Sequence, residues 1–166
     1  AENLIKNLCV GKATNYFIIR SPLVYGSRYK GNISLLIKII KLGLPLPLKN
    51  IKNKRSFIYI ENLNSAILSC LKDKKVINQT YLISDDGSLS TPNLIIAIAS
   101  AMKKKIIIFS FPIYLLCFLA RLLKQTSKFD KLNNNLVVNN DKFKKDFQWS
   151  PPYTISEGIK KSFSGN

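Results

Sequence analysis

The sequence has no histidine and only three cysteines, Cys9, Cys70 and Cys117. The cysteines are far apart, odd in number and each set among apolar residues, so neither metal-ligand spacing nor a disulfide framework is expected. Unpaired cysteines are typical of a reducing compartment, which favours a cytoplasmic protein. The first residues also show no signal-peptide pattern.

Acidic residues are scarce, with 9 Asp and Glu against 26 Lys and Arg, and the net charge is +17. Such an excess could serve a nucleic-acid binder, because basic side chains neutralise phosphates. However, the basic residues are 22 lysines and 4 arginines, and they are scattered along the chain rather than gathered with aromatics. A solvated surface, whose field favours anionic substrates, is therefore preferred over a nucleic-acid partner. A basic nucleic-acid or membrane-surface binder is kept as an alternative.

The sequence has no apolar run long enough for a membrane span. Its longest, residues 106–120, has 15 residues where about 20 are needed, and Pro112 divides it. We expect a strand at 105–111 and a helix at 113–124. That helix is apolar nearly all round, so it is either packed in the interior or lying on a membrane surface, and packing is favoured.

Single strands alternate with helices along the chain, which predicts an α/β fold. Further strands are expected at 15–20, 56–60, 80–84 and 136–138, and helices at 1–10, 32–42, 61–72, 92–103, 140–147 and 154–163. Gly11 and Gly43 are expected to end helices. A hydroxyl of the Ser90-Thr91 pair ahead of Pro92 is expected to cap one helix, and Thr154 another. Residues 21–31 are read as a loop, because proline at position 22 ends a strand.

Two blocks carry the functional signal: Arg20-Ser-Pro-Leu-Val-Tyr-Gly26 after a strand, and Arg55-Ser-Phe-Ile-Tyr-Ile-Glu-Asn62 around one. In open α/β sheets ligands bind beyond the carboxyl ends of strands, and the planar fork of an arginine suits a diphosphate. Together with the ordered pieces G-N, L-P-L-P, S-T-P and F-x-W-x-P-P, they resemble the extended short-chain dehydrogenase/reductases. Within these, the resemblance is to the NAD-dependent nucleotide-sugar epimerase/dehydratase family (UDP-glucose 4-epimerase-like).

This resemblance implies the C-terminal half of such an enzyme, because the family's other signatures are missing. There is no G-x-x-G-x-x-G turn, and none of the seven tyrosines has a lysine four residues on, so no catalytic residue is expected here and the catalytic pair is expected just upstream. The implied fold is the last strands and helices of an NAD(P)-binding Rossmann-like parallel sheet plus a small mixed α/β substrate-binding domain. We assign 1–26 to the Rossmann-like domain, 27–60 to the substrate domain, 61–90 to the Rossmann-like domain again, and 91–166 to the C-terminal substrate-binding domain.

By the same resemblance, Ser21, Pro22 and Leu23 lie beside the nicotinamide of NAD or NADP, with backbone groups facing its carboxamide. The plain alternative is a strand-ending turn. Many family members have an asparagine that touches the sugar nucleotide where Leu23 stands. The substrate of the best-known 4-epimerases therefore cannot be transferred to this chain.

The implied substrate contacts lie further along the chain. Arg55 matches the arginine that binds the diphosphate, with an ordinary exposed cation as the alternative. Asn32 matches an asparagine that hydrogen-bonds the same diphosphate, and its alternative is an ordinary helix cap. An extended segment matches the one that lies against uracil, with a buried edge strand as its alternative: Leu46, Pro47 and Leu48.

The family's second phosphate-binding arginine is missing, and Lys128 or Lys131 could replace it only as point charges. This departure resembles a branch that acts on N-acetylated UDP-sugars in surface-polysaccharide synthesis, as 4-epimerases or 4-keto-sugar reductases. A homodimer is expected for the full-length protein, and poor solubility for the isolated chain. The alternative within the same fold is a non-catalytic NAD-binding scaffold.

Overall fold

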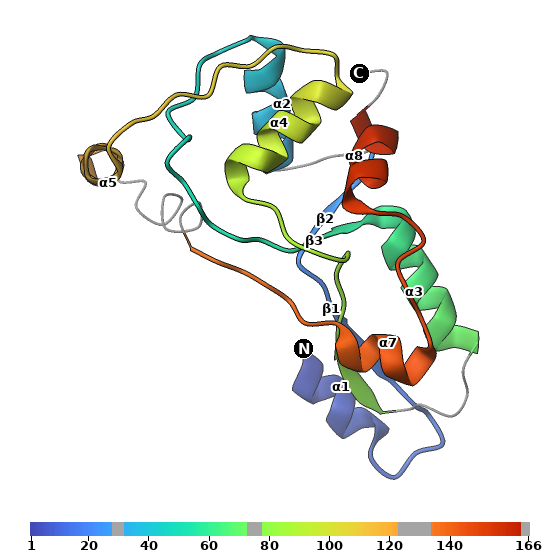
Figure 1. The fold of residues 1–166 in the computed structure, drawn as a ribbon. Helices are drawn as coiled ribbons and strands as arrows, with labels where there is room; N and C mark the ends of the chain where they lie inside the picture. The colour runs from blue at the N-terminus through green and yellow to red at the C-terminus, as the bar shows by residue number, and fades with distance from the viewer. Residues whose placement is uncertain (28–31, 73–77, 123–133, 164–166) are drawn as a thin grey trace.

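The computed structural model describes residues 1–27, 32–72, 78–122 and 134–163, and its strands alternate with helices (Figure 1). The strands are β1 (Phe17–Arg20), β2 (Leu23–Tyr25), β3 (Phe57–Tyr59) and β4 (Gln79–Leu82). The helices are α1 (Glu2–Cys9), α2 (Asn32–Lys41), α3 (Ile60–Lys72), α4 (Thr91–Ala101), α5 (Ile113–Leu122), α7 (Asp141–Phe147) and α8 (Ile155–Phe163). The predicted α/β class is confirmed.

All the paired strands are parallel. β1 pairs with β4, with Phe17 opposite Gln79, and β2 pairs with β3, with Leu23 opposite Phe57. Parallel neighbours need long crossover connections, and α2 and α3 lie in those connections here. This arrangement is that of a Rossmann-like sheet.

Strand β2 corrects the prediction that residues 21–31 form a loop. Pro22 does end β1, but Leu23, Val24 and Tyr25 resume an extended conformation one residue later. They do so because β3, which is buried along its whole length, offers a parallel partner. β-branched and aromatic side chains such as Val24 and Tyr25 also suit a pleated surface.

Two other predicted strands are reduced to single bridges, Leu46 with Ile108 and Arg55 with Leu136. Leu46 stands between two prolines, which have no N–H to donate, so its ladder cannot lengthen. Beside Leu136, the backbone N–H of Val138 donates to the Ser56 hydroxyl instead of to a strand neighbour, at 3.0 Å.

The interior has two apolar clusters. One lies between β2, β3 and three helices, and its fully buried members include Ile40 of α2, Ile95 and Ile98 of α4, and Phe163 of α8. The other lies between the β1–β4 pair, α3 and α7, where Phe143 packs edge-on against Tyr81 and Trp149 at centroid distances of 5.4 and 5.3 Å.

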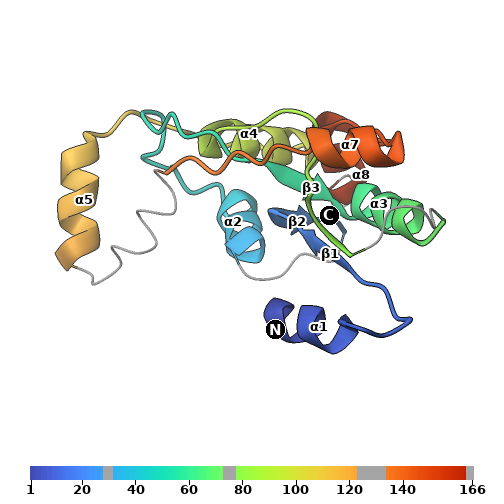
Figure 2. The same cartoon turned by 90° about the horizontal axis from the view of Figure 1, so that it is seen from below.

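Helix α5 contradicts the expectation that the apolar helix 113–124 packs in the interior. Both views show it at one end of the molecule, apart from the other helices (Figures 1 and 2). Tyr114, Phe118 and Leu122 are 72%, 62% and 70% exposed. The apolar pattern alone could not reveal whether this chain supplies a surface for the helix to pack on. Among the described residues, none of the helices combines the length and hydrophobicity needed to cross a bilayer.

Candidate functional site

The two motif blocks lie side by side, because they contain the parallel partners β2 and β3, and both blocks begin at the same end of this pair. Ser21 and Pro22 form the bend between β1 and β2, at the carboxyl end of β1. Because Leu23 lies opposite Phe57 in a parallel register, this bend is level with Arg55, two residues before Phe57. Ser21 is exposed and Leu23 is 38% exposed, so the bend is accessible to a ligand.

Backbone hydrogen bonds to neighbouring segments fix the position of Arg55. Its N–H donates to the Leu89 carbonyl and its carbonyl accepts from the Leu89 N–H, both at 3.0 Å. On the other side it bridges to Leu136. The half-buried side chain places Nη1 3.4 Å from the carbonyl oxygen of Asn134. The guanidinium is therefore anchored at the start of β3, while Lys128 and Lys131 lie outside the described residues.

Asn32 is the first residue of α2, where its match with a diphosphate-binding asparagine requires it. The structure does not describe its side chain. Leu46 and Leu48 are half-buried and pack against the first apolar cluster. This packing agrees with the buried-edge-strand alternative for their side chains, and their contact with a substrate remains a prediction.

Behind the bend lies a buried polar network centred on Asp85, which is 1% exposed. Its carboxylate accepts hydrogen bonds from the Tyr25 hydroxyl at 2.8 Å, from Asn62 Nδ2 at 2.7 Å and from the Tyr59 N–H at 3.0 Å. Burial raises the pKa of the Asp85 carboxyl, while the hydrogen bonds from Asn62 and Tyr25 act in the opposite direction. Burial, and next the charge of Asp85, raises the pKa of the Tyr25 hydroxyl.

The same network fastens the C-terminal segment to the strands. Asn62 exchanges two hydrogen bonds with the backbone of Tyr153, at 2.8 and 3.0 Å. Helix α8 presses so closely on the tyrosines that a Cβ on Gly158 would stand 2.6 Å from the Tyr25 hydroxyl and 2.9 Å from Tyr59 Cγ. The network therefore ties the strand after the bend (β2), the strand after Arg55 (β3) and α8 into one unit.

The sequence did not reveal this network. Asp85 begins an Asp-Asp-Gly-Ser stretch that is typical of a turn, and nothing near it in the sequence marks Asn62 as its partner. The available signal was position, because Asp85 comes shortly after the parallel strand β4, at the end of the sheet where polar groups gather.

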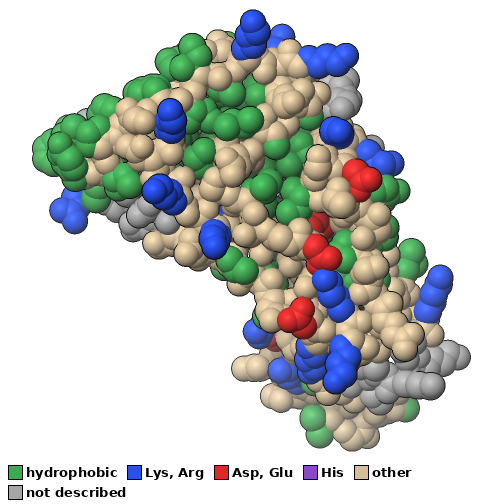
Figure 3. All heavy atoms as spheres, in the orientation of Figure 1, with side chains coloured by type: hydrophobic (Ala, Val, Ile, Leu, Met, Phe, Trp, Pro, Cys, Tyr) green, Lys and Arg blue, Asp and Glu red, His purple; other side chains and the backbone are tan. Residues whose placement is uncertain are grey.

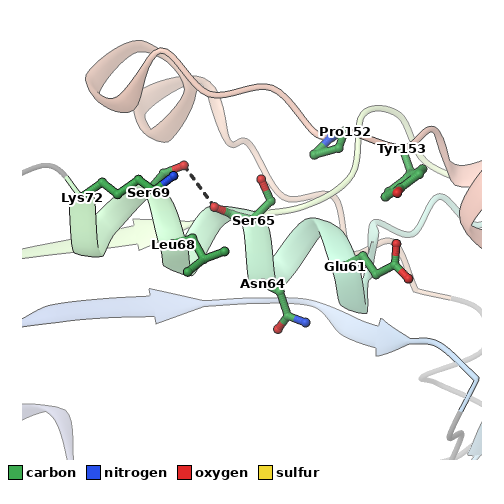
Figure 4. Close-up of a pocket in the computed structure, with 8 residues that line it drawn as sticks. All are labelled: Glu61, Asn64, Ser65, Leu68, Ser69, Lys72, Pro152 and Tyr153. Atoms are coloured by element: carbon green, nitrogen blue, oxygen red, sulfur yellow. Dashed lines mark hydrogen bonds between the residues drawn. The ribbon is translucent and has the colours of Figure 1, made fainter.

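The structure has two surface hollows, and both lie away from the bend and the side chain of Arg55. Figure 4 shows a groove of about 380 Å³ along α3, bounded at one end by Pro152 and Tyr153. A cleft of about 610 Å³ lies between α4 and α8 and includes Leu89, the backbone partner of Arg55, with Lys103 and Lys160 among its lining residues. Neither hollow is lined by Ser21, Pro22, Leu23 or Arg55. Within the described ranges, no cluster of three or more potential metal ligands occurs.

No family model matches the sequence. The chain is 32% identical over 163 residues to a UDP-glucose 4-epimerase of Vibrio cholerae, an alignment that takes in 98% of the chain and 50% of that protein. It thus spans about half the length of the curated relative that it matches.

Solved structures with the same fold include two UDP-sugar 4-epimerases. A UDP-glucuronic acid 4-epimerase from Bacillus cereus, solved with NAD, superposes with a TM-score of 0.71 at 17% identity, over 98% of this chain and 48% of that one. A UDP-glucose 4-epimerase from Thermotoga maritima, solved with UDP-glucose, gives 0.69 at 15% identity over 98% and 49%. RMD from Pseudomonas aeruginosa, complexed with NADPH, gives 0.70 at 16% identity over 99% and 52%. Along 98% of its sequence, and in its fold, the chain is therefore similar to the nucleotide-sugar epimerase/dehydratase family of extended short-chain dehydrogenase/reductases.

Proposed function

We propose that the chain is the C-terminal, sugar-nucleotide-binding part of an NAD(P)-dependent UDP-sugar 4-epimerase or 4-keto-sugar reductase of surface-polysaccharide synthesis. The observation that carries this proposal is the 32% identity to a UDP-glucose 4-epimerase along 98% of the chain. The register that brings the Ser21–Pro22 bend level with Arg55 supports it, because a sugar whose diphosphate is bound at Arg55 must reach the nicotinamide beside the bend.

Different residues of this chain would bind different parts of the UDP-sugar. Arg55 would grip the diphosphate with its planar fork, a geometry that lysine does not offer. Asn32 would add a hydrogen bond from the start of α2, where the free N–H groups and the helix dipole favour an anion. The uracil would lie along an extended segment: Leu46, Pro47 and Leu48.

The cofactor would be NAD or NADP, and when bound it supplies the hydride chemistry. Because the bend is exposed, its backbone would face the carboxamide at one edge of such a cofactor. Here Ser21, Pro22 and Leu23 would orient the nicotinamide. These 166 residues contain no Tyr-x-x-x-Lys pair, so we propose that they do not catalyse the reaction by themselves.

We also propose how the chain is divided between domains, and the oligomeric state and location of the complete enzyme. Residues 1–26 and 61–90 would belong to the cofactor domain, and 27–60 and 91–166 to the substrate domain. The complete enzyme would be a cytoplasmic homodimer. The cytoplasmic location is supported by the cysteine pattern, because three cysteines far apart in the sequence do not suit a disulfide framework.

The test is to supply the half that carries the Gly-rich turn and the Tyr-x-x-x-Lys pair, then to measure UDP-sugar binding by calorimetry. We expect Arg55→Ala to weaken binding by about 1.5–3 kcal/mol, the usual worth of a hydrogen bond to a charged group. Arg121→Ala on α5 is the matched control, because it removes the same charge far from the site. An unchanged dissociation constant for Arg55→Ala would remove this residue from the site.

The alternative is a non-catalytic NAD-binding scaffold of the same fold. The absence of a Tyr-x-x-x-Lys pair from these 166 residues is the observation that keeps it open. If the other half of the protein also lacks that pair, NAD binding without turnover is expected, and the scaffold is the better description.

A further inference from the structure

Helix α5 presents an apolar surface, and within the part of the chain that the structure describes no other element packs over it. Besides Tyr114, Phe118 and Leu122, its exposed side chains include Ile113 at 38% and Leu115 at 39%. The segment that leads into the helix is also apolar and exposed, with Ile107 at 64% and Phe109 at 40%. In Figure 3 apolar side chains gather at the end of the molecule where Figure 1 places α5. The helix has ten residues, about 15 Å, which is half of what a bilayer core requires.

In the described segments that surround this helix, the charged side chains have one sign. Residues 32–55 and 89–122, which contain α2, α4, α5 and their extended connections, include ten lysines and arginines and no aspartate or glutamate. Backbone bonds bring some of these charges close to the apolar segment. The Lys49 N–H donates to the Phe109 carbonyl at 3.2 Å, and Asn50 Nδ2 donates to the Phe111 carbonyl at 3.0 Å. Of the described cations, Arg121 lies on α5 itself, and the exposed ones that precede the helix most closely are Lys103, Lys104 and Lys105.

We propose that α5 binds the surface of an anionic phospholipid bilayer, with its apolar side chains in the headgroup region and the neighbouring lysines against the lipid charges. An interfacial helix needs both contributions, because apolar insertion and attraction to anionic lipids each supply part of the binding free energy. This region has both. The proposal concerns α5 and its cationic surroundings, so it does not depend on the proposed enzymatic function.

A second copy of the chain is a poorer occupant for this surface. Two copies meeting through the same face would bring the two acid-free, ten-cation regions together, and like charges in contact oppose association. An anionic bilayer removes that repulsion and turns the same charges into attraction.

The experiment is co-sedimentation of the chain with phosphatidylcholine vesicles that contain, or lack, phosphatidylglycerol. We expect binding to the anionic vesicles only, and a clear decrease when the salt concentration is raised. The double variant Tyr114→Asp/Phe118→Asp should bind about tenfold more weakly or worse, since burying one such aromatic ring in an apolar environment is worth at least that factor. The matched control is Leu68→Asp/Leu71→Asp, which adds the same charges at exposed apolar positions of α3.

A second measurement locates the contact. The variant Phe118→Trp places a reporter on α5, while the single natural tryptophan, Trp149, is buried and serves as an internal reference. Brominated anionic lipids should quench the new tryptophan and leave Trp149 unaffected. Thermal unfolding followed by circular dichroism would confirm that the substituted chains remain folded.

Three results would overturn the proposal. The first is equal binding of the α5 and α3 double variants to anionic vesicles. The second is a stable dimer that the α5 variant converts to monomers while vesicle binding is absent, which would identify a second copy as the partner. The third is loss of vesicle binding when the other half of the protein is supplied, which would show that this half covers α5.

Discussion

The interior around Asp85 and the surface of α5 reverse the usual distribution of side chains. Asp85 and Asn62 are polar and almost completely buried, whereas Tyr114 and Phe118 are apolar and largely exposed. The buried groups are tolerated because each finds partners within the chain, and among the described residues no buried side-chain nitrogen or oxygen lacks one. The apolar side chains of α5 find no such cover among those residues. The described chain therefore satisfies the buried polar groups of one region and leaves the apolar surface of the other exposed.

The largest change in the free energy of unfolding is expected when the centre of the buried network is removed. Asp85→Ala should lower the free energy of unfolding by about 3–5 kcal/mol, because the N–H and O–H groups of three residues lose their acceptor inside the protein. Those three donors are Tyr25, Tyr59 and Asn62. Urea unfolding monitored by tryptophan fluorescence measures the change. Asp141→Ala, at an exposed carboxylate, is the matched control, and an equal effect of the two substitutions would contradict the role of the network.

A smaller effect should come from crowding the same network. Alanine normally stabilises the interior of a helix relative to glycine by about 0.5–1 kcal/mol. Gly158→Ala should do the opposite and cost about 1–3 kcal/mol, because its Cβ would stand 2.6 Å from the Tyr25 hydroxyl.

The control for this substitution is Ser156→Ala, at an exposed position on the same helix, which should leave the thermal midpoint nearly unchanged. A stabilising Gly158→Ala would show that α8 can move away from the tyrosines, and that the interior is less tightly packed than the structure indicates.

The local parts of this fold could be predicted from the sequence. The capping groups are an example: Ser90 Oγ accepts from the Asn93 N–H at 3.3 Å, and the Thr154 N–H donates to Glu157 at 2.8 Å. The turn glycine Gly43 also has the positive φ, 65°, expected at the end of a helix. These features depend only on neighbours within a few residues, which a pattern can contain.

The parts that could not be predicted depend on distant partners. Strand β2 exists because β3 pairs with it from more than thirty residues away. The bond between Tyr25 and Asp85 joins residues 60 positions apart. Likewise, the apolar pattern of 113–124 gave no information on whether this chain supplies a surface to cover it. For the candidate site, the sequence indicated the blocks containing Ser21 and Arg55, and the parallel register brings those blocks together.

The smallest change in the free energy of unfolding is expected on the exposed surface of α5. Phe118→Ser should change the free energy of unfolding by less than about 0.5 kcal/mol, because the ring is 62% exposed and its removal leaves no cavity. The same substitution at Phe143, which is fully buried between Tyr81 and Trp149, should cost at least the 3–5 kcal/mol typical of deleting a buried phenylalanine ring. Thermal unfolding of both variants in parallel measures the difference. A large loss for Phe118→Ser would mean that α5 already packs against part of this chain in solution, and the contrast between the two regions would then disappear.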